Sequence, residues 1–431
     1  MAVPHEVRST ASQPAYASVV YTGSSPNPAG RGTHVSSVGI SHHPERVGER
    51  AEAYVARGDY AGIEWHIERG GEVLSAGRAG LADPLEGVAL PDVPIYRIYS
   101  MTKPLVAAVA VMLVDEGRLR LSDPVARHVP EFGDPQVREA DGTTRPARTP
   151  LLVEHLFTHR SGLSYNWQQT PVSGLYAERV RFQDEHSLED LVKSLAGVPL
   201  FADPGTVWHY SHSLDVLGHI VAVVEGKPLA AVLEERLFAP LGTTDTGYFV
   251  PESERGRILP MFTEPGDPGA GSLGYAPPPM LYPADDPDYA RGGLGLFSTL
   301  PDYVKLARFL IGGRDPRGER LLSKAGVEAL WTDRLAPAQT PISIAGLPKY
   351  HGYGFGLGGR VLVRPSDSPF SSVQGEAGWE GAGTTYFWLD PKNDITGVVL
   401  SQYLGQRFPL GEDIRAAFYE SLDGTSAPHD G

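Results

Sequence analysis

Cysteine is absent from this sequence of 431 residues. A chain without thiols has no disulfide framework, no thiolate nucleophile, no cysteine-ligated zinc site and no iron–sulfur cluster. The absence does not identify the cellular compartment, because such a chain is indifferent to the redox state of its surroundings.

Long apolar runs and an excess of positive charge are missing as well. No stretch approaches the roughly 18 apolar residues that indicate a membrane span, and the first twenty residues lack the basic and apolar segments of a secretory signal. The formal net charge of −15 repels phosphate backbones and anionic membranes. We therefore expect a soluble, cytoplasmic protein that binds neither nucleic acid nor membrane. Export through an atypical signal, or after removal of a signal segment, stays open.

What is present is an ordinary globular composition, with 41% apolar and 21% charged residues, and 50 glycines and 38 prolines that indicate many turns and long loops. Residues 1–40 lack periodicity and are expected to form an N-terminal arm. The length fits two lobes better than one small core. We expect an α+β fold, in which residues 41–120 and 291–431 form an antiparallel sheet flanked by helices and residues 121–290 form a mainly helical inserted domain.

The division into domains is based on strand and helix patterns, which change along the chain. Strand patterns lie near both ends, and helical patterns with proline-rich loops fill the middle. Strands are predicted at 62–66, 73–76, 353–363, 384–389 and 396–402, and helices at 44–57, 100–115, 151–158, 188–195, 214–225, 229–238, 300–310, 324–330 and 412–422.

The central candidate for chemistry is Ser100, which stands three residues before Lys103. With 30 serines and seven lysines, about half a match to S-x-x-K is expected by chance, so the context matters. The serine begins a helix that is apolar nearly all round, and residues i and i+3 share a helix face, so the amine can reach the hydroxyl. Burial should lower the pKa of the lysine and make it a base or an activating cation. The competing interpretation is an N-cap serine followed by a lysine whose stem extends to water.

Two further segments carry weaker signals. Tyr210, between a proline–glycine turn and a helix, could point its hydroxyl into a cleft, although a buried tyrosine with one hydrogen bond has the same pattern. The glycine-rich run 378–383 precedes a strand and could bring a backbone N–H to an oxyanion, with the N–H of Ser100 as the second donor. A glycine-rich hairpin turn explains that run equally well.

Other catalytic patterns are missing or incomplete. There is no G-x-S-x-G nucleophile elbow, and the glycines of 354–359 are not followed by a helix, which argues against a dinucleotide site. His155 and His159 have the i, i+4 spacing of metal ligands, but no H-E-x-x-H and no third ligand accompany them, so we expect no metal.

Taken in order, these segments resemble the serine β-lactamase and penicillin-binding-protein superfamily, and more closely the class C β-lactamase-like esterases called family VIII carboxylesterases. Ser100 and Lys103 match the superfamily's S-x-x-K motif, Tyr210 matches the tyrosine of its Y-x-N motif, and Trp379-Glu380-Gly381 occupies the place of its K-T-G motif, in the W-x-G form typical of the esterase branch. The resemblance spans about residues 61–400, and the segments 151–163, 201–209, 237–245 and 292–302 support it.

Two departures from the family pattern affect the expected activity. Trp379 replaces the lysine that would bind the carboxylate of a β-lactam, so β-lactamase activity should be slow or nil. His212 replaces the asparagine of the second motif, and a neutral imidazole offers its donor and its acceptor in a different geometry from an amide.

The resemblance implies a serine esterase that hydrolyses carboxylic esters of short acyl chains through an acyl-enzyme. Tyr210, held near its phenolate form by Lys103, would take the proton of Ser100, and the N–H groups of Ser100 and Ala382 would stabilise the oxyanion. No cofactor is required. The residues expected to shape the substrate pocket are Trp379, Gly381, His212, Tyr165, Trp167 and the loop 264–288.

Three alternatives stay open. The same scaffold could act as an amidase or peptidase, could pass the acyl group to an alcohol other than water, or could be a binding protein without catalysis. A small-molecule ester is the expected partner, and the sequence leaves both a monomer and a homo-oligomer open.

Overall fold

A computed structural model of the chain describes residues 45–180, 187–265, 273–278, 281–344, 350–405 and 408–423. The expected N-terminal arm, residues 1–40, lies outside the described residues, as do parts of the loop 264–288.

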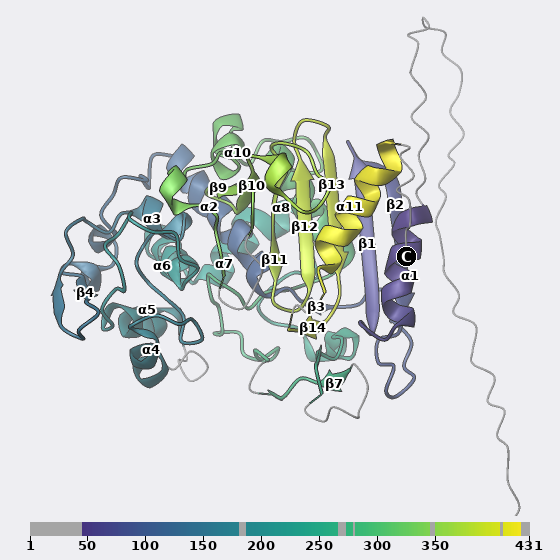
Figure 1. Ribbon diagram of the computed structural model, residues 1–431, viewed down its shortest axis with the longest axis horizontal. Coiled ribbons are helices and arrows are strands. Elements are labelled where there is room, and N and C mark those ends of the chain that lie inside the picture. Colours follow the sequence, from purple (N-terminus) through teal and green to yellow (C-terminus); the bar gives the residue numbers. More distant parts are fainter. Residues whose placement is uncertain are drawn as a thin grey trace, which may run out of the picture.

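The centre of the molecule is a seven-stranded sheet in the order β2-β1-β13-β12-β11-β10-β9, in which all neighbouring pairs are antiparallel (Figure 1). The strands are β1 (Gly62–Arg69), β2 (Glu72–Gly80), β9 (Tyr353–Phe355), β10 (Arg360–Leu362), β11 (Ala377–Gly381), β12 (Thr385–Asp390) and β13 (Ile395–Leu400). β1 pairs with β13 in the register Trp65 to Val399. The sheet is therefore built from both ends of the chain, which confirms the predicted α+β fold.

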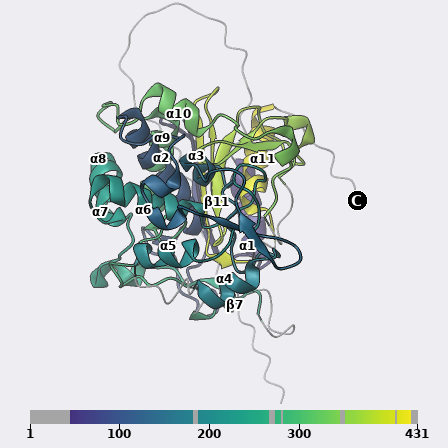
Figure 2. The ribbon, with the colours of Figure 1, turned by 90° about the vertical axis from the view of Figure 1, so that its left-hand side faces the viewer.

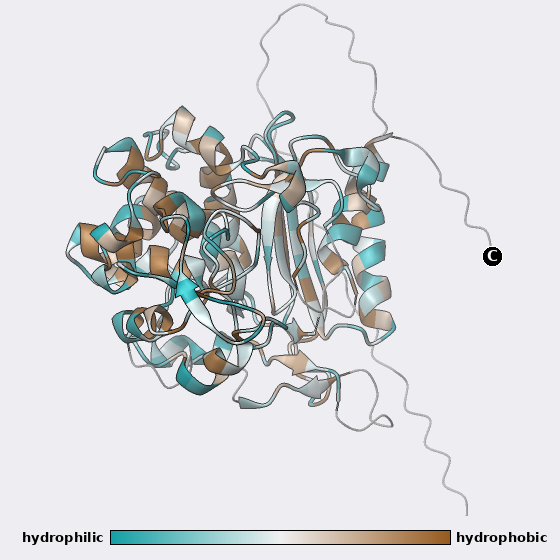
Figure 3. Ribbon diagram, turned by 60° about the vertical axis from the view of Figure 1, so that its left-hand side comes forward, coloured by the Kyte–Doolittle hydropathy of each residue, from teal (hydrophilic) through white to brown (hydrophobic). Residues whose placement is uncertain are grey.

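Helices cover both faces of the sheet because its strands are apolar on both faces. On β12, Tyr386 and Trp388 pack with α1 (Glu45–Ala56) and α11 (Leu410–Asp423), whereas Phe387 and Leu389 belong to the large core on the other side, with α2 (Thr102–Asp115) and α9 (Leu300–Gly312). α10 (Lys324–Leu330) packs against α2 and α9. Figure 3 shows alternating hydrophobic and hydrophilic bands along the helices, as expected for helices with one buried side.

α2 is the exception to that banding, because every residue from Thr102 to Leu113 is buried. It is preceded by β3 (Tyr96–Arg97) and the short 3-10 turn η1 (Tyr99–Met101), and it packs against α6 (Ser213–Glu225) and α10. The prediction of a buried central helix from 100 to 115 is confirmed to within two residues.

The segment between α2 and α9 contains most of the remaining helices. They are α3 (Val153–Phe157), α4 (Ser173–Arg179), α5 (Leu188–Ala196), α6 (Ser213–Glu225), α7 (Leu229–Leu233) and α8 (Ala239–Leu241). Figure 1 shows α3–α6 at the side of the sheet away from α1 and α11, and in Figure 2, where this side faces the viewer, they lie in front. The predicted helix 229–238 is interrupted, because residues Glu234–Phe238 form a π-turn between α7 and α8.

Several short elements escaped the sequence patterns. They are α4 and the strands β4 (Gln136–Arg138), β5 (Thr144–Pro146), β6 (Phe262–Thr263), β7 (Gly274–Tyr275), β8 (Phe297–Ser298) and β14 (Tyr403–Leu404). Strands of two or three residues are too short to show a period of two.

The prediction of one strand over 353–363 is wrong, because two strands, β9 and β10, pair with each other there. Between them the N–H of Gly356 donates to the carbonyl of Gly359 at 2.8 Å, and that of Gly358 donates to the carbonyl of Leu330 at 2.9 Å. A Cβ on Gly356 would lie 2.2 Å from the oxygen of Leu330. The glycines therefore allow a turn packed closely on α10 rather than a continuous strand.

Among the described residues, no single helix is long and apolar enough to cross a membrane. α6 and the segment 229–241 pass that test only as a pair bent by 77°, and α6 is largely buried, with Leu217, Ile220 and Val221 in the main core.

Candidate active site

Ser100 lies where β3 gives way to α2. The preceding residue, Tyr99, has a φ of 44°, in the left-handed region that non-glycine residues rarely adopt. Tyr282, from the loop 264–288, holds it there, because its hydroxyl accepts the N–H of Tyr99 at 3.4 Å and the two rings meet edge to face at 5.0 Å. This sharp change of direction leaves Ser100 half-buried at the start of a helix whose later residues are fully enclosed.

Two side chains reach the hydroxyl of Ser100. Nζ of Lys103 lies 3.0 Å from its Oγ, and the hydroxyl of Tyr210 donates to the same Oγ at 2.6 Å. Nζ of Lys103 lies 4.6 Å from the centre of the Tyr210 ring. A hydroxyl, an amine and a phenol therefore meet at one point, although Tyr210 is 110 residues from Ser100.

Burial shifts the pKa values of Lys103 and Tyr210 in opposite directions. Desolvation lowers the pKa of Lys103 to about 7, against an opposing influence from the carboxylate of Asp215. Desolvation raises the pKa of Tyr210 well above its ordinary value of 10.0. Near neutral pH, therefore, a substantial part of Lys103 is a free amine, whereas Tyr210 is a neutral phenol. This favours Lys103 as the proton acceptor over the Tyr210 phenolate that we expected.

A chain of hydrogen bonds fixes Lys103 from behind. Its Nζ donates to the carbonyl of Gly293 at 2.6 Å, and the N–H of Gly293 donates to Asp215 at 2.8 Å. The other carboxylate oxygen of Asp215 lies 2.8 Å from Nδ1 of His212. Asp215 and Gly293 were not predicted from the sequence. The i, i+3 spacing of His212 and Asp215 on one helix was the signal that could have identified the pair.

Nδ1 of His212 is thus anchored to Asp215 of α6, and a contact of His212 with the substrate stays a prediction. Its side chain is 4% exposed, and its ring lies 4.1 Å from that of Tyr165, centre to centre. Burial lowers the pKa of His212, which favours the neutral imidazole. The structure therefore brings His212 into the wall beneath the site.

The expected oxyanion donor, Ala382, follows directly after β11. The glycine-rich run 378–383, which we expected to precede a strand, lies partly in a strand of its own, because Trp379 and Gly381 belong to β11. A Cβ on Gly381 would come within 2.3 Å of the carbonyl oxygen of Ile98, so this strand end lies against the residues that precede Ser100. Only glycine permits so close an approach. A two-donor oxyanion hole of Ser100 and Ala382 stays a prediction.

Aromatic side chains surround the point where Lys103 and Tyr210 reach Ser100. The rings of Trp379 and Tyr165 each lie 5.6 Å from that of Tyr210, and Trp167 stacks on Tyr165 at 5.2 Å. Trp167 is half-exposed, whereas Trp379 is buried. The structure therefore places all three predicted pocket aromatics at this site, with Trp167 toward solvent.

The two histidines with metal-like spacing have separate roles. Nδ1 of His159 accepts the N–H of Ser211 at 3.2 Å, and its ring lies 4.7 Å from that of Tyr210, so it packs against the tyrosine. Nδ1 of His155 accepts the N–H of Leu152 instead. Within the described ranges, no group of three histidine or acidic side chains is arranged to hold a metal ion.

Known proteins resemble this chain along most of its length. The family model described as Beta-lactamase matches residues 47–419. Protein Rv1367c of Mycobacterium tuberculosis (strain ATCC 25618 / H37Rv) is 36% identical over 349 residues, which cover 79% of this chain and 84% of that protein. Esterase EstB of Burkholderia gladioli is 29% identical over 82% of this chain and 89% of its own. The solved structure of EstCE1, a hydrolase with promiscuous acyltransferase activity, has a TM-score of 0.72 and 23% identity, and it covers 88% of this chain and 97% of that chain.

Proposed function

Because the chain belongs to the beta-lactamase family, as a β-lactamase-like serine hydrolase with esterase relatives, we propose that it hydrolyses carboxylic esters of short acyl chains through an acyl-enzyme on Ser100. The observation that carries this proposal is the convergence of Lys103 and Tyr210 on one oxygen, Oγ of Ser100.

In the proposed reaction, Lys103 first accepts a proton from Ser100 and later returns it to the leaving group. The neutral amine of Lys103 takes the proton of Ser100, and Oγ attacks the ester carbonyl, while the phenol of Tyr210 donates a hydrogen bond to Oγ. The N–H groups of Ser100 and Ala382 bind the oxyanion. Lys103 returns the proton to the departing alkoxide, which leaves as the alcohol. Water then repeats the sequence on the acyl-enzyme, releasing the acid and free Ser100.

The site lies at the junction of the two parts of the chain that we propose as domains. Residues 41–120 and 291–431 supply Ser100, Lys103 and Ala382, and residues 121–290 supply Tyr210 and the aromatic wall of Tyr165 and Trp167. The substrate would enter between them, on the side where Trp167 is half-exposed.

The test is hydrolysis of p-nitrophenyl butyrate together with labelling by a fluorophosphonate. Ser100→Ala should abolish both, with Ser253→Ala, at an exposed serine outside the site, as the matched control. Mass spectrometry of the labelled protein should place the adduct on the peptide that contains Ser100. Full ester turnover by Ser100→Ala would overturn the assignment.

Transfer to an alcohol is the second candidate, because relatives of this chain include acyltransferases and EstCE1 itself is described with both activities. Both reactions share the acyl-enzyme and differ only in what attacks it. Adding a primary alcohol during p-nitrophenyl butyrate turnover, and measuring the butyrate ester of that alcohol against the butyric acid released, distinguishes them. Matched anilide substrates test for amidase activity, and nitrocefin tests the weak β-lactamase activity expected with Trp379 in place of a lysine.

A further inference from the structure

A second pocket lies on the opposite face of the sheet, between β10–β12 and the start of α11. Its volume is about 340 Å³, which falls within the range of small-molecule sites. Much of its wall is aromatic, from Tyr350, Tyr353, Phe370, Tyr386 and Phe408. It shares Gly381 with the vicinity of the active site but neither Ser100, Lys103 nor Tyr210.

The charged group that matters most for this pocket is the guanidinium of Arg360. Arg360 is 1% exposed, and neither Nη1 nor Nη2 has a hydrogen-bond partner among the described residues. The nearest carboxylate oxygen is Oε2 of Glu380, 3.8 Å from Nη1, and the guanidinium lies 4.7 Å from the centre of the Tyr386 ring. Burying a guanidinium without hydrogen bonds is costly, so a group that accepts from both nitrogens would be bound with a substantial gain.

The neighbouring Arg415 differs from Arg360 at one terminal nitrogen, Nη1, although its Nε and Nη2 also lack a hydrogen-bond partner among the described residues. Nη1 of Arg415 donates to Glu376 at 2.8 Å, to the hydroxyl of Tyr386 at 2.7 Å and to that of Tyr353 at 3.0 Å. Glu380 makes no such hydrogen bond to Nη1 or Nη2 of Arg360, since its Oε2 lies 3.8 Å from Nη1, and its Oε1 accepts the hydroxyl of Tyr350. Arg360 therefore has both of its Nη groups open to a ligand, whereas Nη1 of Arg415 is already engaged.

We propose that this pocket binds a small monocarboxylate that carries an aromatic or compact apolar group. Its two oxygens would accept from Nη1 and Nη2 of Arg360 in the bidentate geometry that a guanidinium offers. Its apolar part would lie against the aromatic wall formed by Phe370, Phe408 and Tyr350. This site goes beyond the proposed esterase function and does not depend on it.

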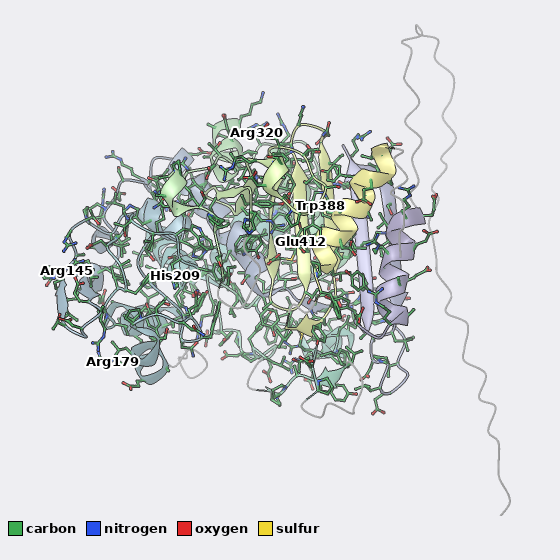
Figure 4. The ribbon with its side chains drawn as sticks, viewed as in Figure 1. Arg145, Arg179, His209, Arg320, Trp388 and Glu412 are labelled. Atoms are coloured by element: carbon green, nitrogen blue, oxygen red, sulfur yellow. The ribbon has the colours of Figure 1, made fainter. Side chains whose placement is uncertain are left out.

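The charges around the pocket make binding depend on pH. Burial and the nearby carboxylate of Glu380 raise the pKa of Glu412 to about 7. Glu412 lies at the start of α11 on the same side of the sheet as Trp388, whereas His209 lies in the helical part (Figure 4). The groups that face Glu412 are Glu380, Arg360, Arg415, Tyr60, Tyr350 and Tyr386. A bound anion disfavours the carboxylate of Glu412 further, so it should bind more tightly below pH 7, where Glu412 is protonated.

Isothermal titration calorimetry with benzoate, in a buffer without carboxylates, tests the proposal. We expect benzoate to bind the full-length protein more tightly at pH 6 than at pH 8, and benzamide, its neutral analogue, to bind at least about tenfold more weakly. Arg360→Met should lose at least about tenfold in affinity for benzoate. Arg364→Met, with the same chemical change just beyond the end of β10 at a residue outside the pocket, should not.

Two further variants keep the test decisive if Arg360→Met does not fold. Phe370→Ala should weaken benzoate more than acetate, because it removes only apolar wall. Glu412→Gln should remove most of the difference between pH 6 and pH 8. Equal affinity for benzoate and benzamide, or unchanged benzoate binding by a folded Arg360→Met, would overturn the proposal and leave a pocket that water alone occupies.

Discussion

The kcat/KM for ester hydrolysis should rise with pH through one inflection near pH 7 and then level off. The reason is Lys103, the amine that we assign as proton acceptor. Raising the pH through 7 converts its ammonium, which cannot accept a proton, into the neutral amine that can. Tyr210 adds no second inflection below pH 10, because its pKa is raised rather than lowered.

The size of the effect follows from the burial of Lys103. Its pKa is lowered from 10.5 to about 7, which corresponds to about 5 kcal/mol in favour of the neutral amine. With a pKa of 7, about a tenth of the amine is neutral at pH 6 and about nine tenths at pH 8, so kcat/KM should increase roughly tenfold between them. A lysine with its ordinary pKa would instead give about a hundredfold increase and a continued rise to pH 10.

Initial rates with p-nitrophenyl butyrate from pH 5.5 to 9.5, corrected for uncatalysed hydrolysis, measure this profile. Lys103→Arg keeps a cation at the site but provides no titration near neutral pH, because the guanidinium stays charged. We expect it to lose at least about a hundredfold in kcat/KM and to show no inflection near pH 7. A wild-type profile that climbs without levelling to pH 10, or a Lys103→Arg variant with an unchanged profile, would refute the assignment.

Three other predictions concern the supports of the site. Asp215→Ala should lower the free energy of unfolding by about 3–5 kcal/mol in urea denaturation, because it removes a buried carboxylate that holds both His212 and the N–H of Gly293; a loss below 1 kcal/mol would contradict that role. Gly381→Ala should reduce kcat about tenfold or more by forcing β11 away from the carbonyl of Ile98, only 2.3 Å from the new Cβ, and wild-type kcat would show that the strand end does not position the substrate. Glu412→Gln should raise the melting temperature at pH 8 but not at pH 4, because the raised pKa of Glu412 makes its ionisation destabilising as pH rises from 4.5 through about 7; an equal gain at both pH values would argue against that cause.

Local patterns were sufficient for much of the scaffold. α10 spans the predicted residues 324–330, and α6 begins one residue before the predicted 214 and ends at 225, because each is an apolar stripe that sequence periodicity reports directly. The strand 353–363 was misjudged because its glycines look permissive in sequence, whereas their contact with α10 decides the turn.

The contacts of the site also differ in whether the sequence could predict them. The contact of Lys103 with Ser100 follows from helix geometry alone, since the two are three residues apart. The contact of Tyr210 with Ser100 depends on how α6 docks beside α2, and residue spacing holds no information about it; only the family resemblance suggested it. The carbonyl of Gly293, which positions Lys103, could not be predicted, because a backbone oxygen has no signature in a sequence.

The pairing of β1 with β13 has a consequence for how the protein is made. Trp65 of β1 pairs with Val399 of β13, more than three hundred residues later. While the chain is being synthesised, β1 and β2 therefore lack the neighbouring strand β13 until translation is almost complete. Contacts so distant along the chain slow folding, and unpaired strand edges invite association with other chains meanwhile. Nascent chains stalled before residue 395 should therefore be strong clients for chaperones, and only release of the last strand and helix permits the sheet to close.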